Sequence, residues 1–259
     1  MNTFPSGATV YPDLAGKTAV VTGGSRGLGA ATARALAAND VTVVVVGRDQ
    51  AAATVVAADI EAQGGRALAV SADCSIQDDV HRLAGEVHNA LGLVDILVTF
   101  AGGNGATVPA GAETAQHWAE VMDGNLTATF LTISAFLDDL TSRAGAIVTM
   151  SSSAARQATG ANAAYAAAKA GVIGLSRHLA GELAEHGVRV NCLCPATVEN
   201  HRMRTYLTDD ARNQLAAGFP LGRIGQPDDI AAATLFLTSA TSAWITGVTL
   251  DIAGGQYLP

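Results

Sequence analysis

Short apolar runs alternate with stretches of helical periodicity along most of this chain. Such runs, rich in β-branched residues, are typical of parallel strands that are buried on both faces, with helices as the crossovers between them. The pattern predicts an α/β fold: a doubly wound parallel sheet of about seven strands with helices on both faces. The predicted strands begin near Thr18, Val41, Ala67, Asp95, Ala146, Arg189 and Thr249.

The first predicted strand runs directly into a glycine-rich turn. Residues 18–29 read TAVVTGGSRGLG, and a helical stretch follows at residues 30–38. Strand, glycine turn and helix in this order form the dinucleotide-binding unit of Rossmann-type folds. Gly23, Gly27 and Gly29 would permit a tight turn, a close approach of backbone N–H groups to a pyrophosphate, and close packing of the helix on the sheet. The positive end of the helix dipole then faces the phosphates.

The end of the second predicted strand, residues 41–49, bears on the choice of cofactor. A carboxylate at this point selects NAD by accepting hydrogen bonds from the ribose 2′-hydroxyl. This chain has Gly47 there, followed by Arg48, and a second guanidinium, that of Arg26, lies in the glycine turn. Two guanidinium groups can bind a 2′-phosphate through charge-assisted hydrogen bonds, which favours NADP(H). Asp49, one position further on, leaves NAD(H) as the alternative.

Tyr165 and Lys169 stand four positions apart in the alanine-rich segment AAYAAAKAG, and Ser152 lies upstream. Residues four apart share one face of a helix. An ammonium beside a phenol favours the phenolate, so we expect the pKa of Tyr165 to be lowered. Such a tyrosine can exchange a proton with an alcohol or ketone oxygen, and the Ser152 hydroxyl could bind the same oxygen. An exposed Tyr–Lys pair on an ordinary helix is the alternative.

Taken together, these motifs resemble those of the short-chain dehydrogenase/reductase family over nearly the whole chain. The resemblance rests on the run TGGSRGLG at residues 22–29, a C-terminal run that begins at Pro227, and Asp73, Ala101, Gly102, Asn125, Ser152, Tyr165 and Lys169. It implies that Tyr165 is the acid/base and that Ser152 orients the carbonyl. It also implies that Lys169 holds the nicotinamide ribose and lowers the tyrosine pKa, and that Asn125 supports a water in a proton relay.

The glycine turn and the resemblance together imply a set of cofactor-binding residues, in which Asp73 contacts the adenine ring. The set comprises Gly23, Ser25, Arg26, Gly27, Leu28, Gly29, Arg48, Asp73, Cys74, Ala101, Gly102, Tyr165, Lys169, Pro195, Ala196 and Val198. Three positions depart from the family pattern. Thr99-Phe100 replaces a pair of asparagines, and we expect Phe100 to alter the floor beneath the adenine ribose. Ala196 replaces a glycine, which alters the wall around the nicotinamide and the substrate.

The length and composition of residues 1–259 are those of a single domain, which we expect to be of the Rossmann type. Residues 1–14 are expected to be an N-terminal extension. Residues 197–222 fall where the family places a mobile lid over the substrate; a plain pair of surface helices is the alternative. Gly103, Asn104, Arg156 and Gln157 are expected to border the substrate pocket.

Composition narrows the range of partners. Of 259 residues, 49% are hydrophobic and 15% charged, and a formal net charge of −8 argues against nucleic acid and anionic membranes as partners. No apolar run reaches the roughly 18 residues that span a bilayer, and the N-terminus lacks a signal-peptide pattern. The three cysteines are interpreted as buried residues in a reducing cytoplasm; a redox pair of Cys192 and Cys194 is the alternative. No His/Cys cluster has metal-ligand spacing.

The sequence therefore predicts an NADP(H)-dependent oxidoreductase that interconverts a ketone and a secondary alcohol on a small-molecule substrate. An NAD(H)-preferring dehydrogenase of the same family is one alternative. A protein that binds the cofactor without turnover is another. The resemblance implies a homotetramer or a homodimer.

Overall fold

A computed structural model of the chain describes residues 10–257, except for the side chains of His201, Arg202 and Arg204. Seven parallel strands form one sheet in the order β3-β2-β1-β4-β5-β6-β7. Their bounds are β1 Thr18–Thr22, β2 Thr42–Gly47, β3 Arg66–Ser71, β4 Ile96–Thr99, β5 Ala146–Met150, β6 Arg189–Pro195 and β7 Thr249–Ile252. The predicted fold class is confirmed, and each strand begins within one residue of its predicted start.

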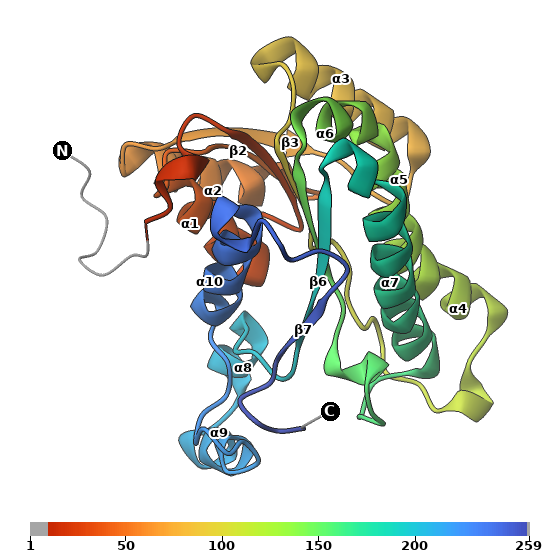
Figure 1. The fold of residues 1–259 in the computed structure, drawn as a ribbon. Helices are drawn as coiled ribbons and strands as arrows, with labels where there is room; N and C mark the ends of the chain where they lie inside the picture. The colour runs from red at the N-terminus through yellow and green to blue at the C-terminus, as the bar shows by residue number, and fades with distance from the viewer. Residues whose placement is uncertain (1–9, 258–259) are drawn as a thin grey trace.

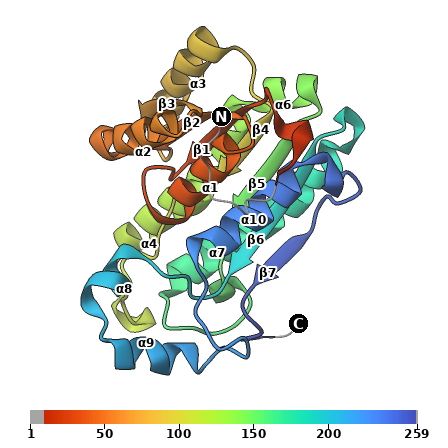
Figure 2. The same cartoon turned by 90° about the vertical axis from the view of Figure 1, so that its left-hand side faces the viewer.

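Helices cover both faces of the sheet (Figure 1). One face is covered by α1 Gly27–Ala37, α2 Gln50–Ala62 and α10 Pro227–Thr238, which lie in front of the sheet in Figure 2. The other is covered by α3 Gln77–Leu91, α5 Ala128–Ala135, α6 Leu137–Arg143 and α7 Ala163–Glu182. The short helix α4 Ala115–Met122 leads into α5 through a π-helical segment, Asp123–Thr127. Two further short helices, α8 His201–Tyr206 and α9 Asp209–Ala216, follow β6.

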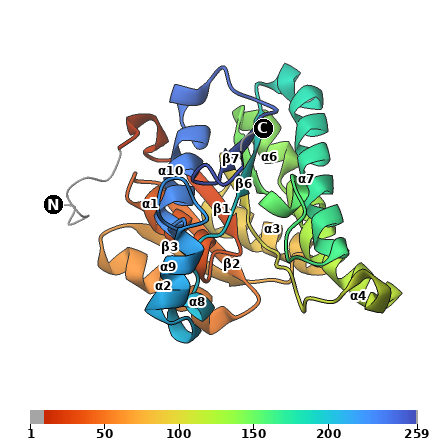
Figure 3. The same ribbon diagram turned by 90° about the horizontal axis from the view of Figure 1, so that it is seen from below.

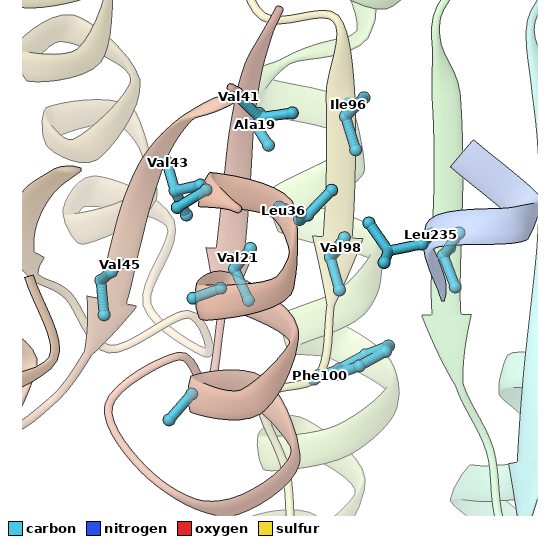
Figure 4. Close-up of a cluster of buried hydrophobic side chains, with 14 of the residues drawn as sticks. Ala19, Val21, Leu36, Val41, Val43, Val45, Ile96, Val98, Phe100 and Leu235 are labelled. Carbon is cyan, nitrogen blue, oxygen red and sulfur yellow. The ribbon is translucent and has the colours of Figure 1, made fainter. Parts of the chain in front are cut away.

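The central strands β1, β2 and β4 are mainly apolar because each one supplies side chains to two cores. Val20 lies opposite Val44 and Leu97 in the neighbouring strands, and all three belong to the core under α3 and α5. The flanking residues Ala19 and Val21 belong to the core under α1 and α10 (Figure 4). All five side chains are fully buried. Burial on both faces therefore explains the continuous β-branched runs of the sequence.

Phe100, which follows β4, lies in the core under α1 and α10 rather than in the cleft. Its side chain is 9% exposed and packs in the same cluster as Val21 and Val98 (Figure 4). The expectation that Phe100 alters the floor beneath a bound ribose was therefore wrong. A large aromatic ring gains more by leaving water than by lining a polar cleft.

The chain reverses its direction of travel across the sheet between β1 and β4. The first three strands extend outward from β1 to β3, and the remaining four extend the other way from β4 to β7. The turns that leave the carboxyl ends of β1 and β4 therefore diverge, which opens a crevice at this edge of the sheet. Figure 3 views this edge from below, with α8 and α9 beside it.

The described part of the predicted N-terminal extension packs onto this fold. Leu14 is fully buried in the core under α1. The backbone N–H of Tyr11 donates to the side chain of Asn39 at 2.6 Å, and the Asp13 carboxylate accepts from the N–H of Ala240 at 2.7 Å. Residues 1–9 of the extension lie outside the described residues.

Candidate active site

A cavity of about 880 Å³ lies at the reversal point between β1 and β4. Its walls come from the turns after the first four strands and from the segment that joins α4 to α5. Many of the predicted site residues line it: Gly23, Ser25, Arg26, Arg48, Asp73, Cys74, Ala101, Gly102 and Asn125. The fold thus brings together residues from five different segments of the sequence around one cleft.

The glycine turn has the geometry that a phosphate-binding turn requires. Gly27 starts α1 with a φ of +53°, and no atom lies within 4 Å of the place that a Cβ would occupy. The backbone there is open to a ligand. At Gly29, by contrast, a Cβ would overlap the backbone of Gly23, so only glycine lets the helix pack this closely. Leu28 between them turns its side chain into the core under α1. The turn therefore fits a dinucleotide pyrophosphate at the start of α1.

Arg26 and Asp49 form an ion pair at the mouth of the cleft. The Arg26 Nη2 and the Asp49 Oδ2 lie 2.5 Å apart, and the Arg26 side chain is 74% exposed. The other carboxylate oxygen of Asp49 caps α2 by accepting from the N–H of Ala52 at 3.1 Å. Arg48 is exposed and forms no ion pair with the part of the chain that the structure describes. The two arginines are thus unequal: Arg26 is held by a carboxylate, whereas Arg48 is available to an anion.

The far end of the cleft is built from Asp73 and Cys74, at the turn after β3. The Asp73 carboxylate accepts from the backbone N–H of Ser75 at 3.0 Å and from its hydroxyl at 2.6 Å, which fixes the turn. The Cys74 side chain is buried, and burial raises the pKa of its thiol to about 11. Cys74 is therefore a protonated, packed side chain near neutral pH.

Ser152, Tyr165 and Lys169 meet where β5 faces the start of α7. Ser152 stands in the turn after β5, and its hydroxyl approaches the Tyr165 phenol closely enough to lower the pKa of that phenol. Burial has the larger effect, and the pKa of Tyr165 is raised overall. The prediction of a lowered tyrosine pKa was therefore wrong for the protein alone. Desolvation disfavours the phenolate more than its neighbours favour it.

The position of the Lys169 ammonium explains why this group does not acidify the phenol. Its Nζ lies 5.6 Å from the centre of the Tyr165 ring and donates to the backbone oxygen of Met150 at 2.9 Å. The Ser151 hydroxyl anchors the backbone of Lys169 by donating to its carbonyl at 2.8 Å. The lysine is 3% exposed, and desolvation lowers its pKa from 10.5 to about 8. Lys169 can therefore lose or regain a proton close to neutral pH.

Asn125 lies in the π-helical segment and is 1% exposed. Its amide nitrogen donates to the carbonyls of Val121 and Gly103, at 2.8 and 3.0 Å, and its amide oxygen accepts from the N–H of Gly103 at 3.0 Å. Asn125 is thus a buried amide that is fully hydrogen-bonded within the protein. One amide proton holds the loop after β4 and the other is bonded to Val121 of α4, so the side chain has no donor left for a water. The water relay implied by the resemblance stays a prediction.

The remaining predicted residues lie at the end of β6, outside the lining of this cavity. The Ala196 N–H donates to the Ile252 carbonyl at 3.1 Å, which ties the segment after Pro195 to β7. Val198 forms an isolated bridge with Gly225. These contacts fix the route of the chain from β6 into α8.

Two of the expected pocket-border residues have partners that the sequence did not reveal. The Arg156 guanidinium pairs with Asp251 of β7 at 3.1 Å, and the Tyr257 hydroxyl lies 3.1 Å from the same carboxylate. Asn104 bonds to Asn162, just before α7. Gln157 is exposed.

Sequence reasoning missed Asn162, which caps α7 three residues before Tyr165. An asparagine directly before a helical stretch is a recognisable N-cap signal and could have identified it. It also missed His117, which lines the cleft and whose ring bonds to the Glu113 carboxylate. No sequence signal distinguishes this pair from an ordinary pair on a helix surface.

Among the side chains that the structure describes within residues 10–257, no three of His, Cys, Asp or Glu are grouped as metal ligands would be. No helix in that same range is long and apolar enough to cross a bilayer. The three cysteines form no disulfide, and all are buried.

Comparison with known proteins agrees with this arrangement of sheet and cleft. The family model described as enoyl-(acyl carrier protein) reductase matches residues 23–256. A 3-oxoacyl-[acyl-carrier-protein] reductase, FabG, of Chlamydia muridarum is 34% identical over 245 residues, which cover 94% of this chain and 98% of that protein. The chain belongs to the short-chain dehydrogenase/reductase family.

Relatives within the short-chain dehydrogenase/reductase family differ in their named substrates. The 3beta-hydroxysteroid dehydrogenase 1 of Eggerthella lenta is 38% identical over 253 residues, covering 96% of this chain and 97% of that protein. Among solved structures, the 3-oxoacyl-[acyl-carrier protein] reductase of Brucella melitensis superposes with a TM-score of 0.90 at 30% identity, covering 100% of this chain and 98% of that one. The similarity to these reductases and dehydrogenases thus covers nearly the whole chain, including all seven strands.

Proposed function

We propose that this short-chain dehydrogenase/reductase is an NADP(H)-dependent enzyme that interconverts a ketone and a secondary alcohol. One observation carries the proposal. Ser152 lies close enough to the Tyr165 phenol to lower its pKa, and the buried Lys169 lies 5.6 Å from the centre of the same ring. These three residues do not line the cavity of about 880 Å³, which lies at the ends of the first four strands of the same sheet. Two hydroxyl donors in this position suit a single carbonyl oxygen. The named activities of the relatives, on 3-oxoacyl and 3-hydroxysteroid compounds, support the same class of reaction.

In the reductive direction, Ser152 and Tyr165 donate hydrogen bonds to the carbonyl oxygen and orient it. When bound, the nicotinamide supplies the hydride. Tyr165, whose raised pKa keeps it protonated near neutral pH, delivers its proton to the oxygen as negative charge develops there. Lys169, with a pKa of about 8, replaces that proton. In the oxidative direction the same groups act in reverse.

The proposed cofactor site follows the cleft. The N-terminus of α1 and the turn containing Gly23, Ser25 and Gly27 would hold the pyrophosphate. Asp73 and the backbone at Ala101 and Gly102 would border the adenosine, and Lys169 would hold the nicotinamide ribose. Pro195, Ala196 and Val198 would border the nicotinamide itself.

The preference for NADP(H) rests on charge at the end of β2. Arg48 is exposed at the cleft and free of a carboxylate partner among the described residues, so its guanidinium can bind a 2′-phosphate. Gly47 leaves the position of the usual carboxylate empty. Asp49, which pairs with Arg26, is the feature that keeps NAD(H) as the alternative.

We propose that residues 197–222 close over the substrate. The helix α9 within this segment has no buried residue, which supports a weakly held element that can move. A closed lid would exclude water from the ketone. The single-domain organisation of residues 1–259 is part of the same proposal.

Exposed apolar side chains support a homo-oligomer. Trp118 and Phe130, on α4 and α5, are 40% and 52% exposed, and Trp244, before β7, is fully exposed. Apolar side chains of this size in water are typical of contact surfaces. A cytoplasmic location is supported by three cysteines that form no disulfide.

The test measures the oxidation of NADPH in the presence of each of four compounds. Three are ketones: a 3-oxoacyl thioester, a keto-steroid and a small cyclic ketone. The fourth is an enoyl thioester with the same acyl chain length as the 3-oxoacyl thioester. We expect turnover of at least one ketone and none of the enoyl compound. Faster reduction of the enoyl compound would overturn the carbonyl assignment. Tight NADPH binding without turnover of any ketone would favour the alternative that the protein only binds its cofactor.

A further inference from the structure

The loop after β4 forms one wall of the cleft and contains no helix or strand over residues 101–109. Ala101, Gly102, Gly103, Gly105 and Ala106 all line the cavity. Here we call residues 101–109 the β4 loop. Since loops without regular backbone hydrogen bonds must be held by other groups, the contacts of the β4 loop decide the shape of this wall.

One side chain, Asn162, connects the β4 loop to the catalytic helix. Its amide oxygen accepts from the backbone N–H of Tyr165 at 2.7 Å and so caps α7. Its amide nitrogen donates to the carbonyls of Asn104 and Ala106, at 2.6 and 3.2 Å. Asn162 is 1% exposed. A single buried amide thus bonds to Tyr165 on one side and to the β4 loop on the other.

A second buried amide holds the other end of the β4 loop. Asn125 bonds to both the N–H and the carbonyl of Gly103. The adjacent Gly102 has a φ of +142°, and a Cβ there would overlap the Asn125 amide. The β4 loop is therefore fixed to the π-helical segment by Asn125 and to the start of α7 by Asn162, and only the second link reaches the backbone of Tyr165.

We propose that Asn162 is a positioning residue that sets the Tyr165 hydroxyl in register with the cofactor-binding wall. This inference rests on the proposed function. The first N–H groups of a helix have no partner within the helix, so the cap fixes where α7 begins and hence where Tyr165 lies. Because the same amide binds the β4 loop, a shift of the loop shifts the tyrosine. A misplacement of about 1 Å between reacting groups can cost on the order of 100-fold in rate.

The replacement Asn162→Asp separates the two links. Aspartate has the same shape and is an equally good N-cap, so the bond to the Tyr165 N–H is kept. It has no proton to donate, and its oxygen faces the two carbonyls of the β4 loop. The substitution therefore removes both side-chain bonds to the loop and leaves the helix cap in place, together with the longer bond of 3.4 Å from the Asn162 N–H to the Asn104 side chain.

Asn39→Asp is the matched control. Asn39 is also buried, at 4% exposure, and its amide nitrogen donates to the Ala35 carbonyl at 3.0 Å while its oxygen accepts from Tyr11. It lies outside the lining of the cleft. The same change of an amide to a carboxyl thus loses a similar donor without touching the active site.

Two measurements, made below the unfolding temperature of both variants, test the proposal. In hydrogen exchange, we expect faster exchange of residues 101–109 in Asn162→Asp and no change there in Asn39→Asp. In steady-state kinetics with NADPH, we expect Asn162→Asp to lower kcat on the order of 10- to 100-fold, and more than it raises the ketone KM. Asn39→Asp should keep kcat within about two-fold of the wild type, because a substitution distant from the active site acts independently of it.

Unchanged exchange in the β4 loop, or a loss of kcat no larger than that of Asn39→Asp, would overturn the proposal. Hydrogen exchange needs no substrate, so it decides the link even where the wild-type protein turns over no ketone. Absence of turnover in the wild type contradicts the proposed function instead, and the two failures are thereby told apart.

Discussion

The Lys169 ammonium lies 5.6 Å from the centre of the Tyr165 ring and donates a hydrogen bond to the Met150 carbonyl. The ammonium thus lies beside the aromatic ring of Tyr165, and its positive charge is bonded to a backbone oxygen. Burial therefore dominates at both residues: it raises the pKa of Tyr165 and lowers the pKa of Lys169 to about 8. The protein alone keeps a protonated phenol beside a lysine that is ready to exchange its proton.

The phenol of Tyr165 should titrate above its ordinary value in the protein alone. The absorbance of phenolate, measured against pH in the wild type and in Tyr165→Phe, isolates this residue by difference. Ser152 lowers the pKa of Tyr165, so Ser152→Ala should raise it further. Titration of Tyr165 below the ordinary tyrosine value in the absence of cofactor would contradict the dominance of burial.

Lys169 should make stability depend on pH in the alkaline range. Its pKa is about 8 in the folded chain against an ordinary 10.5, so the unfolded chain binds more protons between these values. The free energy of unfolding should therefore rise from pH 8 to pH 10.5, by at most about 3 kcal/mol from this group. Below pH 8 the buried charge of Lys169 destabilises the folded state by about 3 kcal/mol.

The variant Lys169→Met removes this cost. We expect it to unfold at higher urea concentration than the wild type at pH 7, with a smaller advantage at pH 10, and to lose activity. An advantage that does not change between pH 7 and pH 10 would mean that the pKa of Lys169 is the same in the folded and the unfolded chain, so that burial does not lower it.

Cofactor preference should depend on the charges at the end of β2. Arg48→Asp should weaken NADPH binding much more than NADH binding, because it replaces the free guanidinium with a charge that repels the 2′-phosphate. Asp49→Asn should tighten NADPH binding several-fold, since it frees Arg26 from an exposed ion pair. Dissociation constants from fluorescence titration measure both effects. Equal changes for the two cofactors would rule out a phosphate site here.

Two glycine substitutions should have opposite effects on stability. Gly29→Ala places a Cβ against the Gly23 backbone, so we expect loss of stability by about 1–3 kcal/mol together with weaker cofactor binding. Gly85→Ala, in the exposed surface of α3, meets no atom within 4 Å and should stabilise the helix by about 0.5–1 kcal/mol. Urea unfolding at neutral pH measures both. A Gly29→Ala variant as stable as the wild type would show that Gly29 does not pack tightly against the Gly23 backbone.

The layout of the fold could be predicted because it depends on local signals. Continuous β-branched runs such as residues 42–47 fit only strands covered on both faces, and the glycine turn follows directly from spacing. These signals also located the cleft, because in a parallel sheet every strand ends at the same edge. Family resemblance then assigned roles to single side chains.

What the sequence could not predict depends on contacts between distant segments. Asn162 and Asn104 are 58 positions apart, and nothing local announces their bond. The pairing of Arg26 with Asp49 and the burial of Phe100 have the same origin. The wrong pKa direction for Tyr165 arose because spacing reveals a neighbouring charge but not how far two groups are removed from water.

The most direct test of the account is the turnover of Tyr165→Phe with NADPH and the best ketone of the panel. The substitution keeps the ring and removes only the hydroxyl. We predict a loss of kcat on the order of 10²–10⁴-fold, with the dissociation constant of NADPH changed little. A variant that keeps wild-type turnover would contradict the assignment of Tyr165 as the acid/base, and with it the proposed chemistry of the site.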